Sequence, residues 1–317
     1  MCNINHDSED QSPDPVSPRR SFTRRKFVQG LTALLATATT GCQSDKIGRM
    51  LQRNLREMSR EELKETLARL EREYKESYGV DIKVHSTPPT EGVLFAYGLD
   101  LSRCVGCRRC AKACVRENNQ SRANADGKHN MPIEWIRVLQ MEKEDGVDVS
   151  EATPYYAPEK VPAEGKFYMP VQCHQCENPS CVKVCPVGAT WKERDGIVAI
   201  DYDWCIGCRY CMVACPYGAR RFNWTTPHLP AKEVNTNTHV LGNRPRYKGV
   251  VEKCTFCIHR TRTGRYPACA EACPVGARKF GNILDPESEI RYLLENKRVF
   301  VFKEELNNKP RFFYFYS

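Results

Sequence analysis

The spacing of apolar residues predicts one long helix before the main part of the chain. The segment 47–78 is strongly charged, yet its larger apolar residues recur at helical intervals. Those that share one face of the helix are Leu63, Leu67, Leu70 and Tyr74. Ser59 and Glu62 form a capping box at which this helix would begin. The segment is either a surface helix that packs on its own domain or a docking helix for a partner subunit.

Short apolar segments predict strands farther along. They are residues 93–101, 135–139 and 197–200, and the first follows a linker at residues 86–92 that is rich in Thr and Pro. The chain ends in an aromatic run at 312–316. Apart from the N-terminal signal described next, no apolar stretch reaches the length of about 18 residues that a membrane helix needs.

Residues 1–42 have the pattern of an export signal. A polar segment precedes the adjacent Arg24 and Arg25, and a modestly apolar run follows at 31–38. A positive region before a short apolar region is typical of signal peptides, and paired arginines are typical of the twin-arginine type. A short basic helix is the alternative.

The end of this segment allows two kinds of processing. Gly41-Cys42 resembles a lipoprotein processing site, although Thr39 stands where leucine is usual. A lipid on Cys42 would tether the mature chain to the membrane surface. Ordinary cleavage after Ala38 is the alternative.

All of the 18 cysteines except Cys2 and Cys42 fall in four blocks, motifs I to IV. Motif I is Cys104, Cys107, Cys110 and Cys114; motif II is Cys173, Cys176, Cys181 and Cys185; motif III is Cys205, Cys208, Cys211 and Cys215; motif IV is Cys254, Cys257, Cys269 and Cys273.

The spacing within these blocks indicates iron–sulfur clusters. Motifs I and III have the bacterial ferredoxin spacing C-x2-C-x2-C-x3-C, in which the fourth cysteine binds the other cluster of a pair. Structural zinc sites usually take two separated cysteine pairs, and disulfides suit repeated C-x2-C pairs poorly. Four 4Fe-4S clusters, and therefore electron transfer, are the expected chemistry. A structural adaptor that binds zinc is a remote alternative.

The residues beside the cysteines suit this chemistry. Gly106 and Gly207 precede the second cysteine of motifs I and III, where a residue without Cβ can adopt positive φ and turn backbone N–H groups toward sulfur. The tetrapeptide Pro-x-Gly-Ala follows motifs II, III and IV, at 186–189, 216–219 and 274–277. Motif I departs from the pattern, with Val115 in place of proline.

The formal charge of +9 does not require a nucleic acid partner. Each oxidised cluster with its four thiolates carries about two negative charges, so four clusters offset most of the basic excess.

These observations predict an α+β fold, a duplicated bacterial ferredoxin-like architecture of two double-cluster units with loop-rich insertions and an N-terminal helical extension. The expected organisation is a signal peptide, a helical extension with a linker, a four-cluster domain and a C-terminal tail, at 1–42, 43–92, 93–282 and 283–317. Motifs II and III, at 171–224, would form the central unit.

The order and spacing of the four motifs resemble those of the four-cluster electron-transfer subunits of molybdopterin oxidoreductases. Their complexes include dimethyl sulfoxide, polysulfide and tetrathionate reductases and formate dehydrogenase, with hydrogenase relatives. The resemblance covers residues 93–282. It implies that motif I shares its clusters with motif IV, and motif II with motif III.

Carried onto this sequence, the resemblance implies four ligand sets. They are Cys104, Cys107 and Cys110 with Cys273; Cys254, Cys257 and Cys269 with Cys114; Cys173, Cys176 and Cys181 with Cys215; and Cys205, Cys208 and Cys211 with Cys185. His174 and the pairs Arg108-Arg109 and Arg220-Arg221 are candidates for tuning the clusters, although a packed histidine and a solvated basic surface are equally ordinary explanations.

The resemblance also implies a relay without catalysis of its own. Its partners would be a catalytic molybdopterin subunit and an integral membrane subunit that handles quinone. We expect the periplasmic side of the inner membrane, because clusters are assembled in the cytoplasm and the twin-arginine route exports folded proteins. The alternative partner is a periplasmic nickel–iron hydrogenase.

Overall fold

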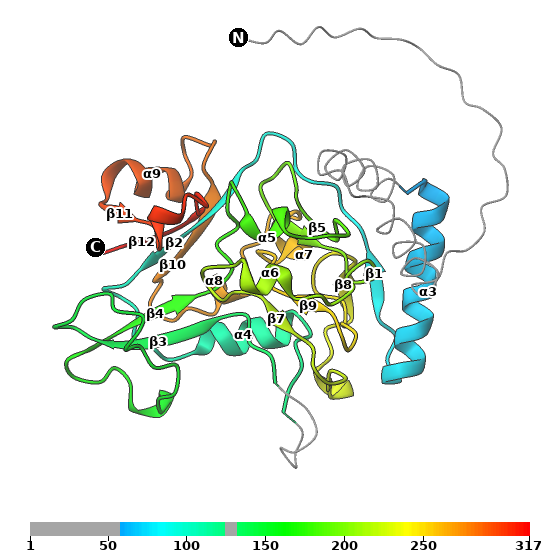
Figure 1. Cartoon of the computed structure of the whole chain (residues 1–317), viewed down its shortest axis with the longest axis horizontal. Helices are drawn as coiled ribbons and strands as arrows, with labels where there is room; N and C mark the ends of the chain where they lie inside the picture. The colour runs from blue at the N-terminus through cyan, green and yellow to red at the C-terminus, as the bar shows by residue number, and fades with distance from the viewer. Residues whose placement is uncertain (1–57, 124–131) are drawn as a thin grey trace, which may run out of the picture. The chain divides into compact units, whose positions relative to one another are not determined.

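The strand that leads into motif I lies inside the largest sheet of the molecule (Figure 1). The computed structural model describes residues 58–123 and 132–317. This sheet has the order β10-β2-β12-β11, with β2 antiparallel to β10 and parallel to β12, and β11 antiparallel to β12. Its strands are β2 (Phe95–Asp100), β10 (Arg278–Asn282), β11 (Val299–Phe300) and β12 (Phe312–Phe315).

Smaller ladders connect the remaining segments. Three are antiparallel pairs, namely β3 (Arg137–Glu142) with β4 (Lys166–Val171), β5 (Thr190–Lys192) with β6 (Val198–Ile200), and β7 (Arg221–Phe222) with β9 (Val251–Glu252). One is parallel and joins β1 (Lys83–His85) to β8 (Asn237–His239).

Short helices carry the cysteine motifs. They are α4 (Arg109–Glu117) in motif I, α5 (Ser180–Lys183) in motif II, α6 (Tyr210–Val213) in motif III, and α7 (Ile258–Thr261) and α8 (Ala268–Glu271) in motif IV. Further helical segments among the described residues are α9 (Glu289–Asn296) and the 3-10 segments η1 (Pro158–Lys160), η2 (Ala231–Glu233) and η3 (Glu304–Leu306). A helix of one turn orients a cysteine side chain with only a few residues. Such short elements leave room in the interior for inorganic centres, which replace part of the apolar core.

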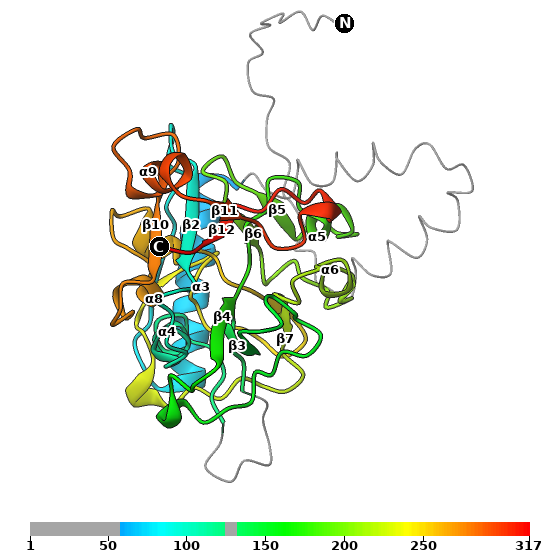
Figure 2. The same ribbon diagram turned by 90° about the vertical axis from the view of Figure 1, so that its left-hand side faces the viewer.

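The predicted N-terminal helix is present as α3 (Arg60–Tyr78), with the Ser59–Glu62 capping box formed. It lies beside β1 (Figure 1), and Figure 2 shows it behind β2, on the far side of the molecule in that view. Leu70 and Tyr74 are buried against β1 residues and their neighbours, and the Tyr74 hydroxyl donates to the Pro245 carbonyl at 3.0 Å. The helix therefore packs on its own chain.

The core follows the large sheet and the strands next to it. Tyr97, Phe256, Phe280 and Phe312 form one aromatic cluster in which Tyr97 contacts each of the other three rings. This cluster is continuous with buried cysteines of motifs I, II and IV. Apolar packing and cysteine positions thus belong to the same interior.

The structure agrees with the predicted strands and differs in how segments are grouped. The strand expected at 93–101 is β2, that at 197–200 is β6, and that at 135–139 begins two residues later as β3. Residues 283–317, expected as a tail, instead supply α9, β11 and β12 to the main sheet. All described residues belong to one compact unit, because α3 and β12 both pack into it.

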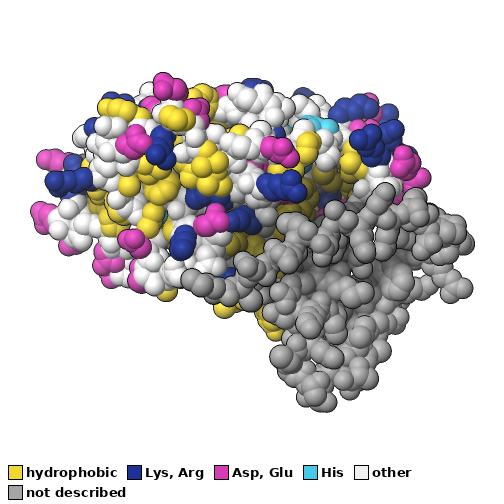
Figure 3. All heavy atoms as spheres, turned by 90° about the horizontal axis from the view of Figure 1, so that it is seen from above, with side chains coloured by type: hydrophobic (Ala, Val, Ile, Leu, Met, Phe, Trp, Pro, Cys, Tyr) yellow, Lys and Arg dark blue, Asp and Glu magenta, His cyan; other side chains and the backbone are white. Residues whose placement is uncertain are grey.

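The surface carries both signs of charge. On the face seen in Figure 3, lysine and arginine side chains alternate with aspartate and glutamate, and apolar areas lie between them. Among the described residues, no helix is both long and apolar enough to cross a bilayer. Residues 1–57, which contain the expected signal with Arg24, Arg25 and Cys42, lie outside the described part.

Candidate iron–sulfur cluster sites

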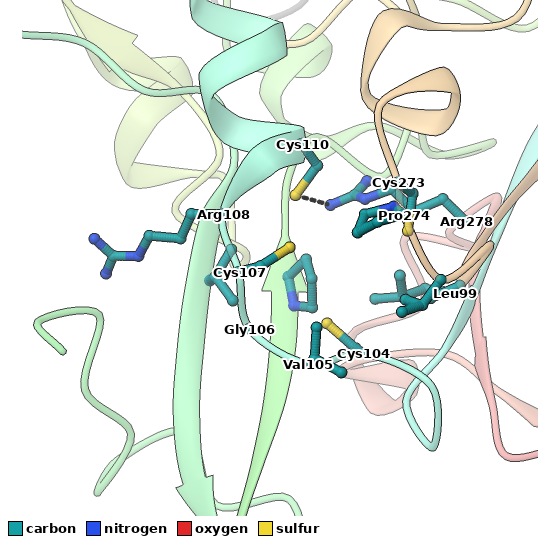
Figure 4. Close-up of a pocket in the computed structure, with 14 residues that line it drawn as sticks. Leu99, Cys104, Val105, Gly106, Cys107, Arg108, Cys110, Cys273, Pro274 and Arg278 are labelled. Carbon is teal, nitrogen blue, oxygen red and sulfur yellow. Dashed lines mark hydrogen bonds between the residues drawn. The ribbon is translucent and has the colours of Figure 1, made fainter. Parts of the chain in front are cut away.

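One cavity is lined by three cysteines of motif I and one of motif IV. Cys104, Cys107, Cys110 and Cys273 surround it and form set A (Figure 4). The first three lie on the loop after β2 and at the start of α4, whereas Cys273 follows α8. These two segments are far apart in the chain and meet because β2 and β10 are neighbours in the sheet, where Leu99 pairs with Arg278.

A second cavity is lined by three cysteines of motif III and one of motif II. Cys185, Cys205, Cys208 and Cys211 surround it and form set D. The backbone N–H of Val251 donates to the Cys205 sulfur at 3.5 Å, which joins β9 to this set.

The other two groups of four cysteines are recognised because their members raise one another's pKa, which requires them to lie close together. Burial raises the pKa of Cys114, and the neighbouring Cys254, Cys257 and Cys269 raise it further; these residues form set B. Burial likewise raises the pKa of Cys176, with further contributions from Cys173, Cys181 and Cys215; these residues form set C. Each of the four sets thus joins cysteines from two motifs.

The sets follow one another in the order A, B, C, D. After burial, Cys269 of set B contributes to the raised pKa of Cys110 in set A. Cys173 of set C does the same for Cys254 in set B. Cys181 of set C does the same for Cys211 in set D. Sets A and B, B and C, and C and D are therefore electrostatic neighbours.

The turns that present the cysteines use the predicted glycines. Gly106 and Gly207 both adopt φ of +73°. A Cβ on Gly106 would lie 2.3 Å from the Tyr168 ring, and one on Gly207 would lie 2.2 Å from the Gly249 carbonyl oxygen. Glycine is therefore required at both positions by conformation and by space.

Several side chains donate hydrogen bonds to cysteine sulfurs. Arg220 contacts Cys181 at 3.2 Å and Arg278 contacts Cys110 at 3.4 Å. Sulfur partners that the motif pattern does not reveal include Asn118, Gln120 and Tyr97, which contact Cys114, Cys114 and Cys269 at 3.6, 3.1 and 3.2 Å. Asn118 and Gln120 follow motif I closely, so a scan for amides beside the cysteines would have found them.

The candidate tuning residues divide into two kinds. Arg108 points away from set A in Figure 4 and lies over the Tyr156 ring at 4.3 Å, and Arg109 is exposed. Arg221 donates to the Glu134 carbonyl at 3.1 Å. Arg220 is buried against a sulfur. The pair at 220–221 is thus not a solvated surface.

His174 is enclosed by aromatic rings. Its ring centroid lies 4.0 Å from that of Tyr217 and 5.1 Å from that of Phe312, and Nε2 lies 3.3 Å from the Tyr314 hydroxyl oxygen. Complete burial lowers its pKa to about 3, so the imidazole is neutral. His174 is therefore a packed histidine, which was the alternative to a role in tuning the clusters.

The arrangement of sulfurs suits clusters better than single ions or disulfides. The cysteines of the described part are all free. A tetrahedral zinc ion with Zn–S bonds of about 2.3 Å would draw its sulfurs to about 3.8 Å from one another. Among the residues described, no three Cys, His, Asp or Glu side chains are gathered closely enough for one ion. Two nitrogens of the buried Arg220, Nε and Nη1, have no hydrogen-bond acceptor among the described residues. The sulfur atoms of a cluster beside Arg220 would supply the missing acceptors.

Comparison with known proteins agrees with this chemistry. Models described as "4Fe-4S dicluster domain" match residues 103–189, 164–245 and 243–283, and these ranges contain all four cysteine motifs. The menaquinone reductase iron-sulfur cluster-binding subunit of Nitratidesulfovibrio vulgaris is 39% identical, over 68% of this chain and 86% of the relative.

Two further relatives belong to other reductases. A selenate reductase subunit of Mesobacillus selenatarsenatis is 38% identical, over 74% of this chain and 76% of the relative. A tetrathionate reductase subunit of Salmonella typhimurium is 34% identical, over 69% of this chain and 71% of the relative. The three relatives thus share most of this chain but come from complexes that are named for different substrates.

Proposed function

This chain belongs to the family of 4Fe-4S electron-transfer subunits of molybdopterin oxidoreductases, and we propose that it passes electrons along one line of four clusters, held by sets A, B, C and D in that order. The family accounts for the cofactor, the relay and the absence of a catalytic role. The assignment of each cysteine to one cluster is our proposal. The observation that carries it is the continuous series of sulfur neighbours from Cys110 to Cys211.

The protein residues have three tasks in this relay. The cysteines hold the clusters, which supply the one-electron chemistry when they are bound. The apolar residues around them exclude water, which lowers the local dielectric constant and makes nearby charges more effective. Donors such as Gln120 and Tyr97 hydrogen-bond to sulfur and so adjust how readily a cluster accepts an electron.

Cysteine variants test the proposed sets. Cys114→Ala and Cys254→Ala come from motifs I and IV but should remove the same electron paramagnetic resonance signal, because both belong to set B. Cys114→Ala and Cys110→Ala come from one motif but should remove different signals. The reverse result would mean that each motif holds its own cluster.

We propose two partners for this relay, a molybdopterin catalytic subunit and an integral membrane subunit that exchanges electrons with quinone. The menaquinone reductase relative supports the second partner. Anaerobic purification of the native complex should recover a pterin subunit and a membrane subunit together, and a menaquinol analogue should reduce its clusters. Recovery of a nickel–iron large subunit would favour the hydrogenase alternative.

We further propose that the protein acts on the periplasmic side of the inner membrane after twin-arginine export, with lipid on Cys42 as one means of attachment. Replacing Arg24 and Arg25 by lysine should retain the protein in the cytoplasm. The same replacement at Arg19 and Arg20, an arginine pair that is not followed directly by the apolar run, is the matched control. Equal periplasmic delivery of both variants would contradict this route. Cleavage before Cys42 and a mass increase from acyl chains would identify the lipid.

A further inference from the structure

The repeated tetrapeptide Pro-x-Gly-Ala is followed by an arginine at two of its three copies. Arg220 follows the copy after motif III, and Arg278 follows the copy after motif IV; the copy after motif II is followed by Thr190. The two arginines are 2% and 6% exposed. A long cationic side chain is thus buried at equivalent positions in the two halves of the cysteine array.

Arg220 lies between sets C and D. Its Nη2 donates to the Cys181 sulfur of set C at 3.2 Å and to the Thr190 hydroxyl at 2.9 Å. Burial alone would lower the pKa of Arg220, but Cys181, Cys211 and Cys173 raise it above its ordinary value. Arg220 also lines the cavity that set D surrounds, so one guanidinium lies beside both sets.

Arg278 has the same relation to sets A and B. Its Nη2 donates to the Cys110 sulfur of set A at 3.4 Å, as Figure 4 shows. Its Nη1 lies 3.3 Å from the Tyr97 hydroxyl, which is itself 3.2 Å from the Cys269 sulfur of set B. Despite burial, Cys110 and Cys269 help to raise its pKa.

Carboxylates do not neutralise these two cations. Other buried arginines have acidic partners, as Arg246 has Glu252 at 2.6 Å and Arg262 has Asp195 at 2.8 Å. Within the described residues, neither Arg220 nor Arg278 forms a salt bridge with Asp or Glu. Because a buried charge must be compensated, the thiolates are left as the counter-charge.

We propose that Arg220 and Arg278 are built-in counter-cations that raise the reduction potentials of the clusters in sets C and D and in sets A and B. The proposal rests on the cluster assignment given above. Reduction by one electron adds one negative charge to a cluster with its thiolates, while the guanidinium keeps its proton. A buried cation therefore stabilises the reduced form more than the oxidised form. Each arginine acts on one pair of clusters, so the two halves of the relay are adjusted independently.

Redox titration of the anaerobically purified protein, followed by electron paramagnetic resonance, tests this role. Arg220→Met should lower the ratio of reduced to oxidised cluster about tenfold at a fixed potential, which for one electron is about 59 mV. Arg278→Met should produce a similar shift in different signals. Arg220→Lys should restore most of the shift, and Arg220→Gln should not, because charge is the cause.

Arg244→Met is the matched control. Arg244 is also completely buried, but its hydrogen bonds go to the Val240 carbonyl and to the Tyr74 and Tyr247 hydroxyls rather than to sulfur. This variant should leave all midpoint potentials unchanged.

Iron content and the number of signals separate failure of the cluster assignment from failure of the arginine proposal. Unchanged potentials in Arg220→Met and Arg278→Met, with full iron content, would overturn the proposal and leave the assignment intact. If both lysine variants keep full iron content but their potentials stay as low as in the neutral variants, charge is not the cause of the shift, and the proposal is also overturned.

Discussion

The ring of Tyr97 stacks on that of Phe312, with centroids 4.9 Å apart and planes 5° apart. The two residues belong to neighbouring parallel strands and are register partners. The contact joins the strand before motif I to the last described strand, and the Tyr97 hydroxyl lies beside Cys269 of set B. The C-terminal segment is therefore part of the structure that holds clusters.

Phe312→Ala should destabilise the protein by about 3–5 kcal/mol, because it removes a fully buried ring and leaves a cavity. Denaturant unfolding of the anaerobic holoprotein would measure the loss, and iron release should become faster. Tyr316→Ala is the control, since that ring is 52% exposed, and its effect should stay within about 0.5 kcal/mol. Equal effects of the two variants would contradict a structural role for β12.

Glu252→Ala should be at least as damaging. The Glu252 carboxylate accepts hydrogen bonds from Arg246, Trp135 and Asn223, at 2.6, 2.9 and 2.7 Å, and is itself buried. Removing it leaves a buried guanidinium unpaired, at a cost of about 3–5 kcal/mol. Glu289→Ala, which removes an exposed partner of Lys279, should cost about 0–1 kcal/mol. A small loss of stability for Glu252→Ala in the same unfolding assay would contradict this prediction, because it would mean that water can solvate the Arg246 guanidinium once the carboxylate is removed.

Gly207→Ala should disturb set D more than backbone conformation alone explains. The new methyl group would approach the Gly249 carbonyl oxygen at 2.2 Å. Gly146→Ala provides the comparison, because Gly146 also has positive φ, +67°, but nothing lies within 4 Å of its Cβ position. The control should cost about 1–2 kcal/mol, the usual cost of a Cβ in the left-handed region. Gly207→Ala should in addition lose iron and one paramagnetic signal, and retention of both would refute the steric argument.

Removal of iron should lower stability and introduce a dependence on alkaline pH. Burial raises the pKa of the Cys104 thiol from 9.0 to about 11, and that of Cys211 likewise to about 11. In the iron-free protein the folded state therefore holds these protons more tightly than the unfolded state. Its stability should be complete below pH 9 and decline as the pH rises toward 11.

Thermal unfolding of the chelated protein across this pH range would measure the effect. The holoprotein is the control and should lack the transition, because its cysteines are already deprotonated by iron. An iron-free protein equally stable at pH 8 and pH 11 would contradict the assigned burial of the thiols.

The sequence predicted the features that depend on neighbouring residues. Two such features are found in the structure: the positive φ of Gly106 and Gly207, and the helix cap at Ser59. Both depend only on local geometry, as does the cysteine spacing. The place of β12 was not predictable, because a parallel pairing between Tyr97 and Phe312 leaves no periodic signal in either segment. The same limit applies to Arg220 and Arg278. A basic residue after a motif gives no indication of its burial until the packing around it is known.

The meeting of Cys104 with Cys273 has a consequence for biosynthesis. The first cysteine of the array emerges from the ribosome long before its spatial neighbour is made, and β12 follows later still. A nascent chain therefore cannot complete set A until translation is nearly finished. If set A holds a cluster, a chain that stops before Cys273 lacks one of its four thiolates and cannot complete that centre.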